Sequence, residues 1–480
     1  MRKPQMLFTD FKQIQSLHPS HKNNLAIDSH KQSNNKQNNH QSLGFNKVNV
    51  QSLPNDFMCQ SQGQSKKSKS LSEKFKEFAY RMKFNYFGSE FEIESPTSTP
   101  TIKKAKKYEL LDYEFYQQNP RGSIIYLLHE KFIIRDKLNK KDRILIQDKL
   151  TRAFKSVTWF TYRNELELPI GSSTYHSDAG WGCMVRTGQM LLFQAMMRHV
   201  FEDNLKYEYI EKITEYREEY LNLLRLFQDN GEGQFSPYSI QNIAFQGLKI
   251  DRKPGDWYGP QAISIVLKRL TKIYKPVKQF TMYVCLEGNI YLNVIQEKSK
   301  DWTQSVFIVI PLRLGLNYIE PEYLSSVKKV FTFPQNVGIA GGRENSALYF
   351  IGISDSSNNL IYLDPHLVQK SVPTCNMQTN EQFYQYESSF HCTKFKKMPL
   401  NRMCTSVAIG FYIRDYNDFL DFQTRIKSLS SGENSIFTVY DQKPEFIDMG
   451  YSYNDQQIKL SSQIGKEDEE MVDDDGFCVV

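Results

Sequence analysis

One cysteine of this 480-residue chain stands where a nucleophile would be expected. Cys183 directly follows a Gly-Trp-Gly segment (180–182), and an apolar pattern of helical spacing runs from it to about residue 199. At a helix N-terminus, unpaired amide N–H groups and the positive end of the helix dipole favour the thiolate, which is the nucleophilic form of cysteine. The same amides can hold an oxyanion. The alternative is a small buried hydrophobe, which is the commoner role of a cysteine.

A thiolate nucleophile needs a base or an imidazolium partner, and His366 is the histidine best placed for that role. It ends a predicted strand with the sequence Leu-Asp-Pro-His (363–366), and extended geometry puts Asp364 and His366 on one side. A carboxylate there fixes the imidazole tautomer and stabilises its charged form. Alone, this segment is equally consistent with a turn that carries a surface histidine. Joined to a cysteine at a helix start, it forms a papain-like constellation.

The elements that must position these residues are helices first and strands afterwards. Helical spacing predicts helices over 143–160 and 183–199, a charged helical insertion over 202–227, and a helix that begins after Pro260. Short β-branched and aromatic runs predict strands over 282–286, 306–310, 347–353, 360–363, 407–413 and 436–440. Residues 347–363 have the pattern of a hairpin that turns at 354–359. This order indicates an α+β fold rather than alternating βαβ units.

Composition excludes several classes of protein. Lys and Arg number 60 and Asp and Glu 54, so the net charge of +6 is too mild over this length to indicate a nucleic-acid partner. The longest apolar run, 306–312, is far shorter than the roughly 20 residues of a membrane-spanning helix. The first residues lack the pattern of a secretory signal, which favours the cytoplasm. Seven scattered cysteines without a CxxC pair predict neither a disulfide framework nor a zinc site, and we expect no metal and no cofactor.

The two ends of the chain differ from its middle. Residues 1–69 form a polar tail rich in Asn, Gln, Ser and Lys, which predicts disorder. Residues 70–107 combine apolar residues at helical spacing with lysines, so they predict an amphipathic helix and linker that either contacts a membrane surface peripherally or packs on the main domain. We expect the folded domain over 108–441, with its insertion at about 202–250, and an acidic tail over 442–480.

Several separated segments resemble, in the same order, the blocks of a known family. The family is the autophagins, the cysteine proteases that process and delipidate the ubiquitin-like modifier of autophagy. The matching segments are WFTYR (159–163), SDAGWGCM with RTGQM (177–190), WYGP (257–260), IPLRLG (310–315), GGRENSALYFIG (341–352) and LIYLDPH (360–366). Together they lie within about 108–441. The resemblance implies a papain-like fold with a small helical insertion after the cysteine-bearing helix.

The resemblance also implies roles for individual residues. Cys183 would be the nucleophile, His366 the acid/base and Asp364 the residue that orients it. Tyr162 would bind the oxyanion together with the Cys183 amide. Without the family, a buried tyrosine with a satisfied hydroxyl would be the simpler interpretation of Tyr162.

Two further residues are expected to control access to the site. Trp257 matches the family tryptophan that lies over the active-site groove, and a loop near Pro334 would act with it as a gate for a slim chain that ends in glycine. The simpler interpretation of Trp257 is an ordinary core aromatic residue. One departure lies nearby, because Cys404-Thr405-Ser406 stands where the family usually has Asp-Pro-Ser. This replacement leaves the local loop geometry open.

The implied activity is that of a cysteine endopeptidase. The enzyme would remove the C-terminal extension of the modifier after its reactive glycine, and it would release the modifier from phosphatidylethanolamine. A non-catalytic scaffold that binds the modifier, or a thiol peptidase for another ubiquitin-like protein, are the alternatives. The acidic end of the chain carries Phe477 and Val480 three residues apart, similar to a short motif that adds a strand to the modifier and fills two pockets. A solvated tail is the alternative there.

Overall fold

The computed structural model describes residues 123–444, apart from 129, 136–137, 202–213, 230–232, 344, 374–379 and 433. All of these residues belong to one unit of the chain. The predicted polar tail 1–69, the predicted amphipathic segment 70–107, and both Phe477 and Val480 lie outside the described residues. Among the helices that are described, none is long and apolar enough to cross a membrane.

A large, mostly antiparallel sheet organises the described part of the chain. Its main path has the strand order β11-β9-β8-β7-β12-β6-β4, and β1 joins it at β8 and carries β2. Only the pair β4 and β6 within this sheet is parallel. The strands are β1 (Ile124–Leu127), β2 (Glu130–Ile133), β4 (Phe280–Val284), β6 (Ser305–Arg313), β7 (Asn336–Arg343), β8 (Ser346–Ser354), β9 (Asn359–Leu363), β11 (Lys396–Pro399) and β12 (Ser406–Ile413).

Two short parallel pairs lie beside this sheet. They join β3 (Tyr162–Asn164) to β10 (Val368–Lys370) and β5 (Asn289–Tyr291) to β13 (Thr438–Tyr440). The first pair matters for the site, because β3 begins at Tyr162 and β10 begins two residues after His366.

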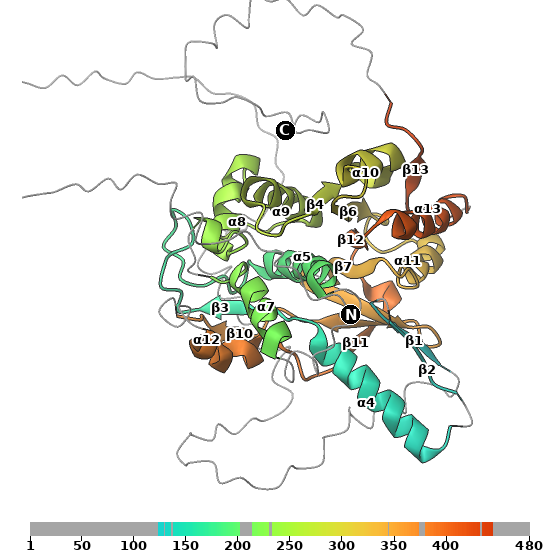
Figure 1. Cartoon of the computed structure of the whole chain (residues 1–480), viewed down its shortest axis with the longest axis horizontal. Coiled ribbons are helices and arrows are strands. Elements are labelled where there is room, and N and C mark those ends of the chain that lie inside the picture. The colour runs from blue at the N-terminus through green and yellow to red at the C-terminus, as the bar shows by residue number, and fades with distance from the viewer. Residues whose placement is uncertain are drawn as a thin grey trace, which may run out of the picture. The chain divides into compact units, whose positions relative to one another are not determined.

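Helices cover both faces of the sheet. They are α4 (Lys140–Ser156), α5 (Cys183–Phe201), α7 (Thr214–Arg225), α8 (Ile240–Gly247), α9 (Pro260–Tyr274), α10 (Leu292–Ser299), α11 (Leu324–Val330), α12 (Asn380–Glu387) and α13 (Tyr416–Ser430). Figure 1 shows α5 at the centre, with α8 and α9 to one side of it and α10, α11 and α13 grouped on another.

The strands are apolar on both faces, and this explains the two layers of helices. In β6, Phe307 and Val309 pack into the core that contains α5 and α9, whereas Ile308 and Ile310 pack into a second core with α11 and α13. Successive side chains of a strand point to opposite faces, so a continuous apolar run requires cover on both sides. Such a three-layer arrangement buries α5 almost completely and holds it against β7, β8 and β12.

Local sequence signals account for several helix starts. The side chains of Asn139, Ser239 and Asp415 accept hydrogen bonds from main-chain amides in the first turns of α4, α8 and α13. Helix α9 begins at Pro260, where the missing N–H costs nothing. Asn, Ser and Asp, the residue types at positions 139, 239 and 415, are among the preferred caps of helix N-termini.

The predicted α+β class and papain-like architecture are confirmed. Helix α5 begins at Cys183 as predicted, the antiparallel pair β8 and β9 confirms the hairpin over 347–363, and each predicted strand corresponds to an observed one. Helices α7 and α8 fall within the predicted insertion at about 202–250. Strand β7 was not predicted, although it lies in the middle of the sheet.

Candidate active site

The main-chain geometry before α5 fixes the position of Cys183. The amide of Gly182 donates to the main-chain oxygen of Asp178 at 2.8 Å, and the amide of Arg186 donates to the Gly182 oxygen at 2.9 Å. The chain therefore turns tightly into the helix, and Cys183 occupies its first position with only 3% of its surface exposed. Unpaired amides at a helix start stabilise a negative charge, so this position favours a thiolate.

His366 and Asp364 meet directly beyond the end of β9. The imidazole Nδ1 lies 2.6 Å from Asp364 Oδ1, and the main-chain amide of His366 donates to the same oxygen at 3.1 Å. Because the carboxylate occupies Nδ1, the other ring nitrogen, Nε2, remains for the hydrogen bond between His366 and the Cys183 side chain. The structure thus brings together the three residues that the sequence predicts as a triad.

The charges in this group support one another. Burial opposes ionisation of the Cys183 thiol, but the hydrogen bond and charge of His366 and the Ala347 amide lower its pKa below the ordinary value. Burial also disfavours the imidazolium, yet Asp364 and Cys183 raise the pKa of His366 to about 9. For Asp364, burial is again outweighed, and His366 and Lys396 hold the pKa of the carboxyl well below its usual range. The group therefore favours a thiolate and an imidazolium side by side.

Tyr162 lies against both members of this ion pair. Its ring meets the His366 ring edge-on, with 5.4 Å between the centroids, and its hydroxyl is hydrogen-bonded to Cys183. Burial, followed by the negative charges of Cys183 and Asp178, raises the pKa of Tyr162, so the hydroxyl keeps its proton. The Tyr162 amide donates to the Pro365 oxygen at 2.9 Å, which ties β3 to the histidine segment. A neutral hydroxyl beside the nucleophile is a suitable oxyanion donor.

The turn between β7 and β8 forms another side of the site. The main-chain amide of Ala347, at the start of β8, is hydrogen-bonded to the Cys183 sulfur. Next to this turn, the Cys404 amide donates to the Gly342 oxygen at 2.7 Å, and Thr405 accepts from the Leu314 amide at 2.8 Å. The segment that replaces the family's usual Asp-Pro-Ser is therefore part of the wall beside the nucleophile.

The prediction that a loop near Pro334 gates the groove is wrong. The Pro334 oxygen accepts a hydrogen bond of 2.7 Å from Arg198, which lies in the last turn of α5. A helix rises 1.5 Å per residue, so this contact is about 22 Å along the axis from Cys183. Strand β7 starts beside Pro334 and runs back toward the nucleophile, so the loop at the site is the one at its other end, between β7 and β8.

Trp257 lies on the loop before α9 and is 52% exposed, so it is not a core aromatic residue. Helices α5 and α9 run in the same direction, because Gly188 packs on Ile263 near their starts, and His199 in the last turn of α5 bonds to the Lys278 oxygen just after the end of α9. The start of α9 therefore lies at the same end of the pair as Cys183. This agrees with an exposed position beside the site.

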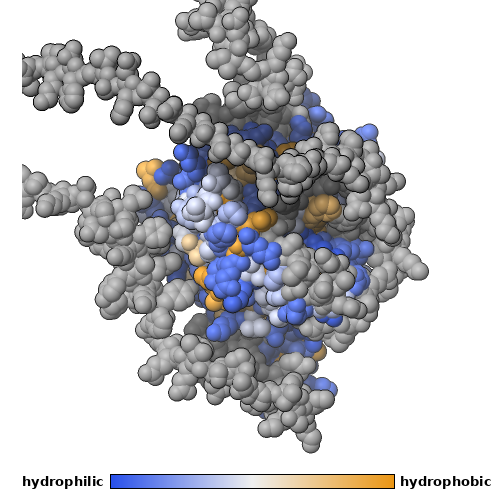
Figure 2. Space-filling view, turned by 90° about the vertical axis from the view of Figure 1, so that its left-hand side faces the viewer, coloured by the Kyte–Doolittle hydropathy of each residue, from blue (hydrophilic) through white to orange (hydrophobic). Residues whose placement is uncertain are grey.

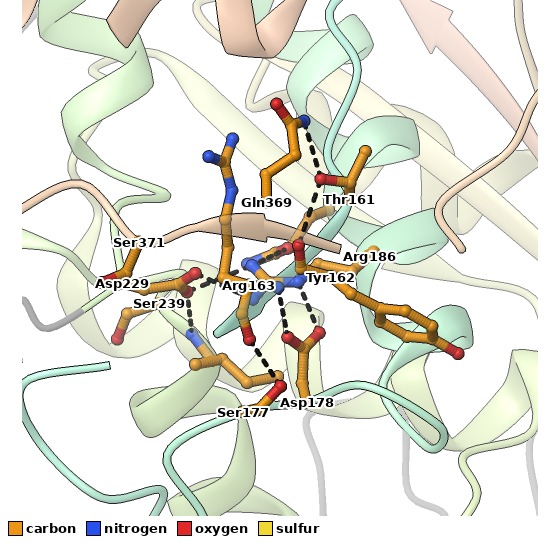
Figure 3. Close-up of polar contacts among 12 residues, drawn as sticks. Thr161, Tyr162, Arg163, Ser177, Asp178, Arg186, Asp229, Ser239, Gln369 and Ser371 are labelled. Atoms are coloured by element: carbon orange, nitrogen blue, oxygen red, sulfur yellow. Dashed lines mark hydrogen bonds and ion pairs between the residues drawn. The ribbon is translucent and has the colours of Figure 1, made fainter. Parts of the chain in front are cut away.

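A buried ionic cluster stabilises the start of α5. The Arg186 guanidinium bonds to Asp178 at 2.7 Å and to both oxygens of Asp229 at 2.8 and 3.1 Å. Asp178 also accepts the amide of Arg163, the residue after Tyr162, at 2.7 Å. Figure 3 shows the two Asp178 oxygens pointing toward these two donors. One carboxylate thus joins the strand that carries Tyr162 to the helix that carries Cys183.

Burial would lower the pKa of the Arg186 guanidinium, but Asp178 and Asp229 raise it above the ordinary value. Arg186 therefore remains a full cation, although its side chain is almost completely buried. Removal of Arg186 would leave two carboxylates in the interior without the cation that they share.

Sequence reasoning missed several residues that support the site. Ala347 acts on Cys183, Lys396 binds Asp364 and Arg186 binds Asp178 through contacts that only the fold creates. The neighbouring motif GWGCMVR contained a weak signal for Arg186, since an arginine one turn into an apolar helix requires a buried partner. Nothing in the run of lysines over 394–397 distinguished Lys396.

Apolar residues are exposed around this part of the molecule. Leu367 directly follows His366 and is 52% exposed, and Leu168 and Tyr175 are exposed on the loop after β3. On the side that carries β3 and α8, hydrophobic residues are interspersed among hydrophilic ones instead of forming one large patch (Figure 2). This pattern suits contact with an extended chain better than it suits a broad hydrophobic protein interface.

The arrangement can carry out acyl transfer through a thioester. It offers a thiolate, an imidazolium next to it, a carboxylate that fixes the imidazolium, and hydroxyl and amide donors for an oxyanion. Among the described residues, no group of three or more His, Cys, Asp or Glu side chains could hold a metal ion.

Comparison with known proteins gives consistent matches. Residues 147–425 match the family model of the peptidase C54 catalytic domain. Cysteine protease ATG4B of Xenopus laevis is 34% identical over 327 residues, which cover 62% of this chain and 80% of that protein. Cysteine protease ATG4A of the same organism is 30% identical over 356 residues, covering 68% and 83%. Cysteine protease ATG4a of Arabidopsis thaliana is 32% identical over 327 residues, covering 63% and 67%.

Proposed function

Because this chain belongs to the peptidase C54 family of cysteine proteases, we propose that it acts on the ubiquitin-like modifier of autophagy, with Cys183 as nucleophile, His366 as acid/base and Asp364 as the residue that orients it. The observation that carries this proposal is the meeting of three residues at the start of α5: Asp364 bonds to Nδ1 of His366, and the hydrogen bonding and charge of His366 lower the pKa of the Cys183 thiol. The sequence blocks shared with the autophagins support the choice of substrate.

In the proposed mechanism, the Cys183 sulfur attacks the carbonyl carbon of the modifier's reactive glycine. The carbonyl oxygen becomes an oxyanion, and the Tyr162 hydroxyl and the Cys183 amide stabilise it. His366 gives its proton to the departing amine, and a thioester of the modifier remains on the sulfur. Water, deprotonated by the now neutral His366, then hydrolyses the thioester. The sulfur leaves as the thiolate, and His366 is again protonated.

Two leaving groups suit the same attack. One is the peptide that extends beyond the glycine of the precursor, and the other is phosphatidylethanolamine, which is joined to the glycine through an amide. The bond that breaks is a carbon–nitrogen bond in both cases, and His366 protonates the nitrogen. Support for both comes from the resemblance, so we propose processing and delipidation as activities of one site.

Trp257 and Leu367 are proposed to line the groove for the end of the modifier. Both are about half exposed, and they flank the nucleophile from the loop before α9 and from the residue after His366. Large apolar side chains on two sides favour a chain without a side chain at the reactive position, which is the property of glycine. The tail motif with Phe477 and Val480 is proposed to hold the body of the modifier.

The remaining proposals concern organisation and location. We propose a peptidase domain over 108–441 with its insertion at about 202–250, an N-terminal polar tail over 1–69, an amphipathic helix and linker over 70–107 that either contacts a membrane surface peripherally or packs on the main domain, and a C-terminal acidic tail over 442–480. A cytoplasmic enzyme would meet both the precursor and the lipid-linked modifier. The scattered cysteines, which include the proposed nucleophile, fit a reducing compartment.

The test incubates the full chain with a modifier precursor that carries a C-terminal extension and measures the product mass. We expect cleavage immediately after the glycine, complete loss of cleavage in Cys183→Ser, and full activity in Cys285→Ser, whose thiol is buried in the other core. A ubiquitin precursor serves as the second substrate. Cleavage of ubiquitin but not of the autophagy modifier would contradict the substrate, and activity in Cys183→Ser would contradict the nucleophile.

A further inference from the structure

A lysine holds the side of the Asp364 carboxylate that faces away from His366. Lys396 Nζ lies 2.7 Å from Asp364 Oδ2, while His366 takes Oδ1. Strand β11 begins at Lys396 and pairs with β9. Lys396 lies opposite Tyr362, and Tyr362 is two residues before Asp364. The sheet itself therefore delivers the ammonium to the carboxylate. Its side chain is 39% exposed, so it approaches from the surface.

All three oxygens of Asp364 have hydrogen-bond partners. Oδ1 accepts both the His366 ring and the His366 amide, Oδ2 accepts Lys396, and the main-chain oxygen accepts the Trp159 indole N–H at 2.8 Å. A carboxylate with both oxygens occupied cannot rotate without the loss of a charge-assisted hydrogen bond. The orientation of the imidazole is thereby fixed through the orientation of Asp364.

The charge of Lys396 acts on the same carboxylate that holds the imidazole. The titratable and charged groups around it are Tyr362 across the strand pair, Asp364 and His366 after β9, Cys392 and Lys394 on the segment before β11, and Cys183 and Tyr162 beyond the imidazole. Asp364 is the anion in direct contact with Lys396. A cation on one carboxylate oxygen offsets part of the negative charge that stabilises the imidazolium on the other.

We propose that Lys396 is a positioning residue of the catalytic centre: it fixes the Asp364 carboxylate through Oδ2 and limits how strongly that carboxylate retains the proton on His366. This role rests on the proposed triad and adds a fourth member to it. The proton must leave His366 for the departing amine in each cycle, so an imidazolium that is held too strongly slows this step.

The test compares Lys396→Met with wild type in two measurements on the full chain. The first is the rate at which iodoacetamide alkylates Cys183 as a function of pH, read by mass on the Cys183 peptide so that other cysteines do not contribute. The second is kcat and KM for the modifier precursor. Lys396→Arg tests whether a cation is sufficient. Lys370→Met is the matched control, because Lys370 is also near the site but 77% exposed and paired with Glu165 instead.

In Lys396→Met we expect the alkaline inflection of the alkylation profile, where His366 loses its proton, to move up by about half a pH unit, as for a partly exposed ion pair. We expect kcat to fall several-fold with KM unchanged, because Lys396 does not touch substrate. Lys396→Arg should restore both, and Lys370→Met should match wild type. An inflection that stays in place or moves to lower pH overturns the proposal. Alkylation needs no modifier, so the result stands even if the proposed substrate is wrong.

Discussion

At the scale of single residues, the Cys183 and His366 pair determines how activity depends on pH. The pKa of the thiol is lowered and that of His366 is raised to about 9, so the ion pair exists at neutral pH. We expect kcat/KM to rise on the acid side as the thiolate forms and to fall through about pH 9 as His366 loses the proton that the leaving amine needs. A pH series with the modifier precursor measures both limbs. An alkaline limb near the ordinary pKa of histidine would contradict this arrangement.

Asp364→Asn tests the cause of the raised pKa of His366. Without the carboxylate, the imidazolium loses its hydrogen-bonded anion, so the alkaline limb should move to lower pH and kcat should fall by about 10²-fold to 10⁴-fold.

The raised pKa of His366 also makes the stability of the fold depend on pH, and this contribution should decrease as the pH rises. A raised histidine pKa stabilises the fold fully below its ordinary value of 6.5, and this contribution disappears as the pH rises through about 9. Unfolding in urea at two pH values on either side of this range checks the sign.

Local patterns singled out the three triad residues and the family resemblance gave them roles, but neither indicated every residue that supports them. Cys183 was found through a Gly-Trp-Gly turn before an apolar run, and Asp364 and His366 through the two-residue period of a strand. Ala347 acts only through its amide, which no side-chain type can indicate. Pro334 was placed wrongly because strand β7 was not predicted, so nothing indicated which end of this strand faces the nucleophile.

At the scale of elements, the entry into α5 leaves no room for a side chain at Gly182. A Cβ there would lie 2.5 Å from Asp178 Oδ2 and 2.7 Å from Asp178 Cβ. Gly182→Ala should therefore push the loop away from β3, cost about 1–3 kcal/mol of stability and reduce kcat. Thermal unfolding and cleavage assays measure the two effects. In the control Gly432→Ala the nearest atom is 3.7 Å away, and we expect no change; equal stability of the two variants would contradict the argument.

The buried ionic cluster joins three elements, so its loss should affect the whole site. Arg186→Met leaves Asp178 and Asp229 buried without their shared cation, which should cost about 3–5 kcal/mol. Urea unfolding followed by tryptophan fluorescence measures this loss. The control is Arg152→Met, which removes a partly exposed pair with Asp148 within α4 and should cost less than about 1 kcal/mol. Similar costs for the two arginines would show that the cluster does not support the fold.

Strand β7 escaped prediction for a physical reason. Strand β7 reads Asn-Val-Gly-Ile-Ala-Gly-Gly-Arg, and its glycines dilute the β-branched pattern. Gly338 is required by packing, since it has a φ of +104° and a Cβ there would lie 2.5 Å from the Tyr349 ring. A central strand that must pass beneath a large aromatic ring is thus recognisable only when its neighbours are known. Strands such as β6, buried on both faces, were evident because their apolar runs are continuous.

At the scale of the whole molecule, the proposed tail motif separates recognition from chemistry. A short motif tethered to the catalytic domain raises the effective concentration of the modifier near the groove without any contact to the reacting atoms. Binding through the tail should therefore influence KM, while the triad and the oxyanion donors determine kcat. Small peptides that fill only the groove would bypass the tail altogether.

Phe477→Ala tests this separation. The aromatic side chain is the larger of the two proposed anchors, so its loss should weaken modifier binding by about tenfold or more and raise KM, while kcat and the cleavage of a short peptide remain at the wild-type level. In an added strand, neighbouring side chains point to opposite faces, so Cys478→Ala, next to Phe477, is the matched control and should leave binding unchanged. Binding of the modifier to the Cys183→Ser background, measured by calorimetry, avoids turnover. Unaltered affinity in Phe477→Ala would mean that the folded domain alone recognises the modifier, and the search for the docking surface would then move to the exposed residues around Trp257 and Leu367.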